Sequence, residues 1–235
     1  LNTSDEWIVT RSGIRQRHFS NKDETTSKMA IMAGQQAIKN ANLEASDIDA
    51  IILATSTADF TFPSAATMVQ AGLGIKSGFA YDVQAVCAGF IYAMSTANAQ
   101  IISGQANRIL VIGSETFSNL MDWTDRSTCV LFGDGAGAVV LEAYSCSGDK
   151  EDRGILSVDL NSDGNGKGMA EVMVPGRASY ELLVTRPEAG ALETQALAGG
   201  LLTADTAGEK PPVRLIGAKV RRGSGGLGLD LGHFN

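Results

Sequence analysis

Short apolar runs alternate with longer stretches of helical spacing along the first two thirds of the chain. The apolar runs are bounded by polar or glycine residues, which predicts four buried strands at 50–56, 79–84, 108–115 and 136–144. Helical stretches lie between the first three of them. Because alternating strands and helices form a mostly parallel sheet covered on both faces, the pattern predicts an α/β fold.

Three helices are expected, at 25–43, 63–74 and 87–104. The first has small or apolar residues at helical spacing, with Thr25 or Thr26 as the candidate N-cap. The second has Ser64 as its candidate N-cap. The third is nearly uncharged and is closed by Gly104. A helix that is apolar all round is expected to be buried on all sides.

The character of the chain changes near residue 184. Residues 184–235 hold ten of the 27 glycines and three of the five prolines, and they show no sustained period. We therefore expect residues 1–183 to form one unit and residues 184–235 an irregular, flexible tail.

Composition excludes several classes of protein. The formal net charge of −7 argues against nucleic-acid binding, which normally needs a basic face. No apolar run is long enough for a membrane span, and the polar start of the sequence does not resemble a signal peptide. An odd number of cysteines without metal-ligand spacing fits a reducing cytoplasm, and we expect no metal site.

Cys87 is a candidate nucleophile. It follows a predicted strand and opens a predicted helix, where backbone N–H groups are unpaired and the helix dipole is positive. Both features favour the thiolate, and the same amides can hold a developing oxyanion. Ala88 and Gly89 leave room for a substrate. The local pattern leaves open the alternative of a small buried cysteine that acts as a hydrophobic residue.

Three other features carry weaker signals. Cys129 lies in an apolar run and Cys146 in a polar loop, so neither is expected to be a nucleophile. Residues 132–138, FGDGAGA, resemble a phosphate-binding loop, but neither a helix nor a Lys-Ser or Lys-Thr pair follows. A tight glycine turn between strands is the better prediction for this segment.

Residues 3–18, TSDEWIVTRSGIRQRH, combine one tryptophan with several basic residues. The segment can be a solvated loop. Alternatively, it can bind an anionic, aromatic ligand, with Trp7 stacking on the aromatic part and Arg11 meeting phosphate.

Five segments, in this order, resemble beta-ketoacyl-acyl-carrier-protein synthase III, the initiating condensing enzyme of type II fatty-acid synthesis. They are residues 3–18, FPSAA at 62–66, CAGF at 87–90, WTDRST at 123–128 and FGDGAGAVVLEA at 132–143. The resemblance covers about residues 2–183. It implies a thiolase-like α/β fold, of which this chain holds the first half of the two-fold repeated αβαβα architecture, and a homodimer.

The resemblance also implies roles for particular residues. Cys87 matches the nucleophile that takes an acyl group from acyl-CoA, commonly acetyl-CoA, before condensation with malonyl-acyl carrier protein. Trp7 and Arg126 match the residues that flank the CoA adenine, with Thr3 and Arg11 in the same site.

Phe62 matches an aromatic residue that reaches across the dimer into the partner's acyl pocket. The CoA thioester is a substrate, so no cofactor is implied.

The family's catalytic histidine and asparagine motifs are not found in this sequence. His18 matches no catalytic position, and His233 has no neighbouring family pattern. Two hypotheses follow from the resemblance. The chain is an acyltransferase whose partner groups are not recognisable in the sequence, or it is a truncated or frame-shifted fragment with partial acyl or CoA binding.

Overall fold

The computed structural model describes residues 1–145, 154–155, 157–162 and 164, and the backbone of five short strands between residues 171 and 230. Cys146, His233 and most of residues 184–235 lie outside the described residues, so the predictions for them stay predictions. None of the helices in the described part is long and apolar enough to cross a membrane.

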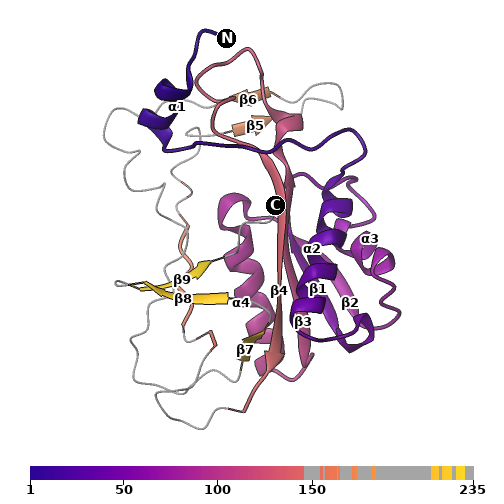
Figure 1. The fold of residues 1–235 in the computed structure, drawn as a ribbon. Helices are drawn as coiled ribbons and strands as arrows, with labels where there is room; N and C mark the ends of the chain where they lie inside the picture. The colour runs from indigo at the N-terminus through magenta and orange to yellow at the C-terminus, as the bar shows by residue number, and fades with distance from the viewer. Residues whose placement is uncertain are drawn as a thin grey trace.

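A five-stranded sheet in the order β2–β1–β3–β4–β7 forms the centre of the fold (Figure 1). Its strands are β1 (Ala50–Ala54), β2 (Phe79–Val83), β3 (Arg108–Thr116), β4 (Asp134–Ala143) and β7 (Val213–Ile216). The four strands predicted from the apolar runs are confirmed.

The sheet is mixed, so the expectation of a mostly parallel sheet is wrong on the β4 side. β1 is parallel to β2 and β3, whereas β4 is antiparallel to β3 and β7. Parallel neighbours need a long crossover, which is usually a helix. The connection from β3 to β4 contains turns and the short helix η3 (Phe117–Leu120), so β4 returns antiparallel.

Hydroxyl side chains cap α2 and α3 as the sequence predicts. The longer helices are α1 (Asp5–Ser12), α2 (Thr26–Asn40), α3 (Ala65–Gly72) and α4 (Gly89–Ile102). The Thr25 hydroxyl caps α2 by accepting from the Lys28 N–H, and the Ser64 hydroxyl caps α3. Beyond the end of α4, Gly104 has a φ of 74°, in the left-handed region that favours glycine.

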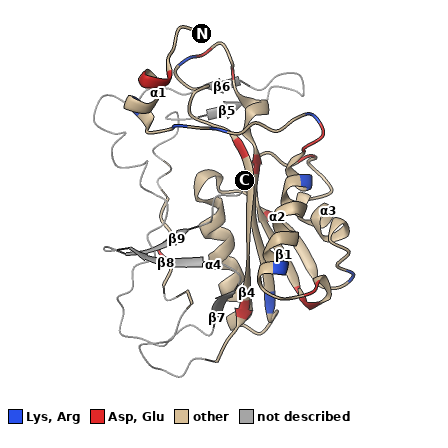
Figure 2. Ribbon diagram, viewed as in Figure 1, with Lys and Arg blue, Asp and Glu red and all other residues tan. Residues whose placement is uncertain are grey.

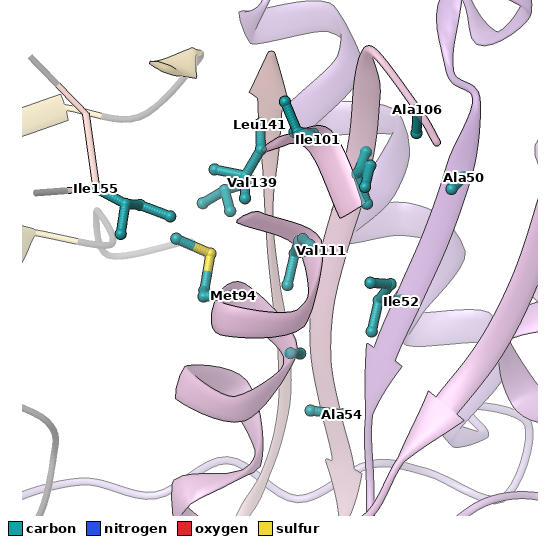
Figure 3. Packing of buried hydrophobic residues seen from close by; sticks show 13 residues of the cluster. Ala50, Ile52, Ala54, Met94, Ile101, Ala106, Val111, Val139, Leu141 and Ile155 are labelled. Carbon is teal, nitrogen blue, oxygen red and sulfur yellow. The ribbon is translucent and has the colours of Figure 1, made fainter. Parts of the chain in front are cut away.

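Helices cover both faces of the sheet. α2 and α3 lie on one face and α4 on the other (Figure 1). The α2/α3 face packs on Ile51, Leu53 and Leu110, and these side chains are fully buried. The α4 face packs on the alternate positions of the same strands, among them Ile52 and Val111 (Figure 3). The period of two along β1 and β3 therefore supplies two separate cores.

α4 buries one face, so the expectation of burial on all sides is wrong. Its buried residues are Gly89, Ala93, Met94, Ala97 and Ile101. Ile91 and Tyr92 are half-buried, and Ile102 is 52% exposed. Figure 2 shows no charged residue along α4. Some apolar side chains of α4 are therefore not covered by the described part of the fold.

Three strands fall within residues 184–235, where the sequence shows no sustained period. β7 extends the central sheet, and β8 (Lys219–Gly223) pairs with β9 (Gly226–Asp230) in an antiparallel ladder. A second ladder joins β5 (Glu171–Met173) and β6 (Glu181–Leu183). The domain boundary expected at 183/184 is not tested by these strands.

Candidate functional site

Cys87 lies on a tight turn between the end of β2 and the start of α4. The turn is the short helix η2 (Val86–Ala88), and the Cys87 side chain is exposed. Val86 has a φ of 48°, a left-handed conformation that costs a β-branched residue roughly 1–2 kcal/mol. A residue keeps such a strained conformation only where the surrounding structure holds it, so contacts around Val86 fix the backbone of this turn.

The start of α4 approaches the central sheet closely. Gly89 is buried, and a Cβ atom at this position would lie 3.3 Å from the Cβ of Ala54 at the end of β1. The N-cap residue Ala88 makes no side-chain hydrogen bond to the first turn of α4. The helix N-terminus therefore offers backbone N–H groups that no side-chain cap occupies, next to the Cys87 thiol.

Two arginines contact the Trp7 ring, one from its own helix and one from a distant part of the sequence. The guanidinium carbons of Arg11 and Arg126 each lie 4.4 Å from the centre of the Trp7 ring, within the range of a cation–π contact. The Arg126 guanidinium also donates a 2.6 Å hydrogen bond to the Asn2 carbonyl oxygen. The structure thus brings together three of the four residues assigned to CoA binding. Thr3, the fourth, is the neighbour of Asn2.

The loop that carries Arg126 is fixed by its own aspartates. Asp125 accepts hydrogen bonds from the Ser127 hydroxyl and N–H and from the Thr128 hydroxyl, and these bonds lower the pKa of Asp125. The Asp122 carboxylate accepts from the Thr124 hydroxyl and N–H, which lowers the pKa of Asp122. Both carboxylates therefore act as turn-forming acceptors.

Asp134 ties the N-terminal segment to the sheet. Its carboxylate accepts four hydrogen bonds, from the N–H and hydroxyl of Ser20 and of Ser118, at 2.6–2.9 Å. Its N–H donates to the His18 carbonyl oxygen at 2.8 Å. Asp134 opens β4, and both Gly135 and Gly137 lie inside this strand. The prediction of a glycine turn for FGDGAGA is therefore wrong from Asp134 onward.

Arg17 reinforces the same connection. It donates to the carbonyl oxygens of Cys129 and Phe132, at 2.6 and 2.8 Å. Cys129 is 2% exposed, which agrees with the expectation that it packs as a hydrophobic residue. His18 is exposed, and its recorded contact uses its backbone.

Phe62 lies on the loop between β1 and α3. Its side chain is 81% exposed, more than any other large hydrophobic side chain recorded as exposed in the described part. The following helix is anchored, because the Asp82 carboxylate accepts from the N–H groups of Ala65 and Ala66. No partner chain is present, so the predicted role of Phe62 across a dimer is untested.

Neither Asp134 nor Glu115 was singled out from the sequence. The half-buried carboxyl of Glu115 accepts from the Ser56 N–H at 2.7 Å and from the Thr57 hydroxyl. Burial raises the pKa of Glu115, against the opposing effect of these hydrogen bonds. The sequence signal that could have found Glu115 was an acidic residue in a strand that ends at the same edge of the sheet as the Cys87 turn.

Among the described residues no His, Cys, Asp and Glu side chains are grouped to hold a metal ion.

The comparisons with known proteins agree with the fold. The family described as 3-Oxoacyl-[acyl-carrier-protein (ACP)] synthase III matches residues 81–164, which include Cys87. A Beta-ketoacyl-[acyl-carrier-protein] synthase III from Ruegeria sp. is 67% identical over 172 residues, which are 73% of this chain and 53% of the relative. One from Jannaschia sp. is 67% identical over 164 residues, 70% of this chain and 50% of the relative.

Two solved structures of such synthases are also similar to part of this chain. The 3-oxoacyl-[acyl-carrier-protein] synthase III of Aquifex aeolicus is 45% identical with a TM-score of 0.68, covering 77% of this chain and 56% of that one. The enzyme of Pseudomonas aeruginosa is 42% identical with a TM-score of 0.69, covering 77% of this chain and 55% of that one. The chain spans about half the length of these relatives.

The fold is therefore that of the thiolase-like α/β proteins. Within this class, the comparisons confirm the resemblance to the beta-ketoacyl-acyl-carrier-protein synthase III family for the aligned part of the chain.

Proposed function

We propose that the chain accepts an acyl group from acyl-CoA onto Cys87, as the first step of a beta-ketoacyl-acyl-carrier-protein synthase III reaction. The observation that carries this proposal is the exposed Cys87 on a strained turn at an uncapped helix N-terminus, within the matched residues 81–164. A thiolate is the nucleophile that thioester exchange needs, and a helix N-terminus stabilises negative charge.

The chemistry balances without a cofactor. The Cys87 thiolate attacks the thioester carbonyl carbon, a new carbon–sulfur bond forms, and the bond to the CoA sulfur breaks. The CoA thiolate leaves and takes up a proton from water. Backbone N–H groups at the start of α4 are the proposed donors to the oxyanion of the tetrahedral intermediate. Those of Ala88 and Gly89 would have to give up their hydrogen bonds to the Ala85 and Val86 carbonyl oxygens. The CoA thioester is thus the substrate, and no other cofactor is proposed.

We place the nucleotide end of CoA at Trp7, Arg11 and Arg126, with Thr3 beside them. The support is the clustering of two guanidinium groups with the Trp7 ring: the cations suit phosphates, and adenine can stack on the ring once a guanidinium moves off it. The second substrate of the proposed reaction is malonyl-acyl carrier protein, which loses CO2 to give the carbanion that attacks the acyl thioester.

The proposed assembly is a homodimer that works in the cytoplasm. The exposed Phe62 supports the dimer, because a side chain so open to water gains free energy when a partner covers it.

The test is incubation of the purified chain with acetyl-CoA, followed by intact mass measurement. We expect an added acetyl group on the wild type and none on Cys87→Ala, whereas Cys129→Ala is acetylated normally. Malonyl-acyl carrier protein is then added to the acetylated chain. Ketoacyl product shows the complete reaction, while acetylation alone limits the proposal to its first step. An unmodified wild-type chain would contradict it.

A further inference from the structure

Glu115 lies on the face of the sheet that carries α4 and the Cys87 turn. Alternate residues of β3 face the same way, and Val111 on this face packs in the α4 core (Figure 3). Gly113 is next, and a Cβ atom there would lie 3.4 Å from the Phe90 ring of α4. Glu115 follows at the same spacing, near the carboxyl end of the strand.

The Glu115 carboxyl fastens the segment that continues β1. One oxygen accepts from the Ser56 N–H at 2.7 Å and the other from the Thr57 hydroxyl. The Thr57 oxygen in turn accepts from the Thr116 N–H at 2.9 Å. Thr26, at the start of α2, donates to the Thr57 carbonyl oxygen at 2.6 Å. Glu115 is thus the member of this network that holds both Ser56 and Thr57.

The same segment contacts both ends of the Cys87 turn. The Thr55 N–H donates to the carbonyl oxygen of Val83, the last residue of β2, at 3.2 Å. Ala54 meets the turn's other end, at Gly89. A short run of chain therefore connects the Glu115 carboxyl to the strained backbone that presents Cys87.

Two further observations distinguish this network from an ordinary structural contact. The Ser56 hydroxyl oxygen is buried without a hydrogen-bond partner in the described part of the chain, which costs free energy. Burial also raises the pKa of Glu115. Groups kept at such a cost beside a reactive residue often serve function rather than stability.

We propose that Glu115 is a positioning residue, which fixes residues 54–57 through Ser56 and Thr57 and thereby sets the geometry of the Cys87 turn. This inference rests on the proposed acylation of Cys87. Misplacement of a reacting group by about 1 Å can lower a rate roughly 100-fold. Loss of the network should therefore slow acylation without weakening CoA binding at the separate Trp7 site.

The experiment compares two pairs of variants in the full chain. Thr57→Val removes the hydroxyl and keeps the shape, whereas Thr57→Ser keeps the hydroxyl. Glu115→Ala removes the carboxyl, whereas Glu115→Gln keeps an acceptor for the Ser56 N–H. The control is Glu142→Gln in β4, where the carboxylate holds Arg108 at 2.9 Å on the same sheet. Acetylation of Cys87 is followed by intact mass over a range of acetyl-CoA concentrations.

We expect Thr57→Val and Glu115→Ala to lower the maximum acylation rate about 10- to 100-fold, with an unchanged half-saturating acetyl-CoA concentration. Thr57→Ser and Glu115→Gln should recover most of the rate. Glu142→Gln should keep the wild-type rate. Unchanged rates in folded Thr57→Val and Glu115→Ala would overturn the proposal. So would a matching loss in Glu142→Gln, because the effect would then follow stability alone.

A second measurement separates this inference from the proposed function. If acetyl-CoA leaves the wild type unmodified, the proposed function fails, and the alkylation rate of Cys87 by iodoacetamide replaces acylation as the readout. Slower alkylation in Thr57→Val, restored in Thr57→Ser, still supports the positioning role. Equal alkylation in wild type and both Thr57 variants overturns it.

Discussion

The guanidinium of Arg126 lies 4.4 Å from the centre of the Trp7 ring, although the two residues are far apart in the sequence. Asn2 holds the same guanidinium by a hydrogen bond, and Asp125 holds the loop that carries it. Arg11 contacts the Trp7 ring as well. The guanidinium thus lies directly on the ring, so an adenine that is to lie between Trp7 and Arg126 must first separate them.

We expect Trp7→Ala and Arg126→Ala each to weaken CoA binding about fivefold or more, because a lost cation–π stack costs about 1 kcal/mol. Calorimetric titration of CoA measures the change. Trp123→Ala is the control, since the Trp123 ring packs edge-on against Phe19 instead. Equal CoA affinity in all three variants and the wild type would contradict the placement of the nucleotide.

Local patterns in the sequence predicted the elements but not the contacts between them. The apolar runs located β1 to β4, and the hydroxyl residues Thr25 and Ser64 were recognisable as caps, because these signals lie within a few residues. The direction of β4 was missed because it depends on the connection. The roles of Asp134 and Glu115 were missed because their hydrogen-bond partners lie far away in the sequence and leave no period.

For the candidate site, too, some features could be predicted from the sequence and others could not. Its place between a strand and a helix made Cys87 a candidate nucleophile but left a buried hydrophobic cysteine open. The family resemblance decided its assignment, as it did the assignment of Trp7 and Arg126 to one site. No sequence pattern showed that Asn2 would hold Arg126, because a backbone carbonyl carries no residue-type signal.

Cys87 should be alkylated faster than Cys129. The Cys87 side chain is exposed, whereas Cys129 is 2% exposed and its carbonyl oxygen accepts a hydrogen bond from Arg17. A thiol must reach the reagent as a thiolate, so burial slows the reaction. Brief treatment of the folded chain with iodoacetamide, followed by peptide mapping, gives the order of labelling. Cys129 labelled at an equal or higher rate would contradict the exposure that the structure gives Cys87.

Gly78 should tolerate no side chain. Its φ is 83°, and a Cβ atom would overlap the Asp49 carbonyl oxygen. We expect Gly78→Ala to lower the free energy of unfolding by about 1–2 kcal/mol for the left-handed backbone and a further 1–3 kcal/mol for the overlap. Urea denaturation measures the sum.

The matched control is Gly74→Ala. Gly74 has a φ of 73° with no atom near its would-be Cβ, so it should lose the backbone part alone. Equal losses for the two variants would show that the contact with Asp49 is relieved by a small shift.

The Asp134 carboxylate should stabilise the fold above its unfolded pKa and stop doing so in acid. Burial by itself would raise the pKa of Asp134, but the hydrogen bonds from Ser118 and Ser20 outweigh it and leave that pKa below its ordinary value. Because an unfolded aspartate titrates near about pH 3.9, the unfolded chain binds this proton first as the pH falls. Stability therefore falls with pH across this window and reaches its floor below the folded pKa.

Asp134→Asn should thus lower the free energy of unfolding by about 1 kcal/mol at pH 7. This value is at the low end of the range for hydrogen bonds to a charged group, because the Asp134 carboxylate is partly open to solvent. The difference between variant and wild type should shrink as the pH falls below about 3.9, because the unfolded wild-type chain then binds the proton, and it should vanish only below the lower folded pKa, where the folded carboxylate is neutralised as well. Urea titrations at a series of pH values measure it. Asp23→Asn, which removes an exposed carboxylate of the same charge, is the control and should have nearly the wild-type free energy of unfolding at pH 7. A gap between Asp134→Asn and wild type that stays constant down to pH values well below the unfolded pKa would mean that the shape of the side chain, and not its charge, holds Ser20 and Ser118.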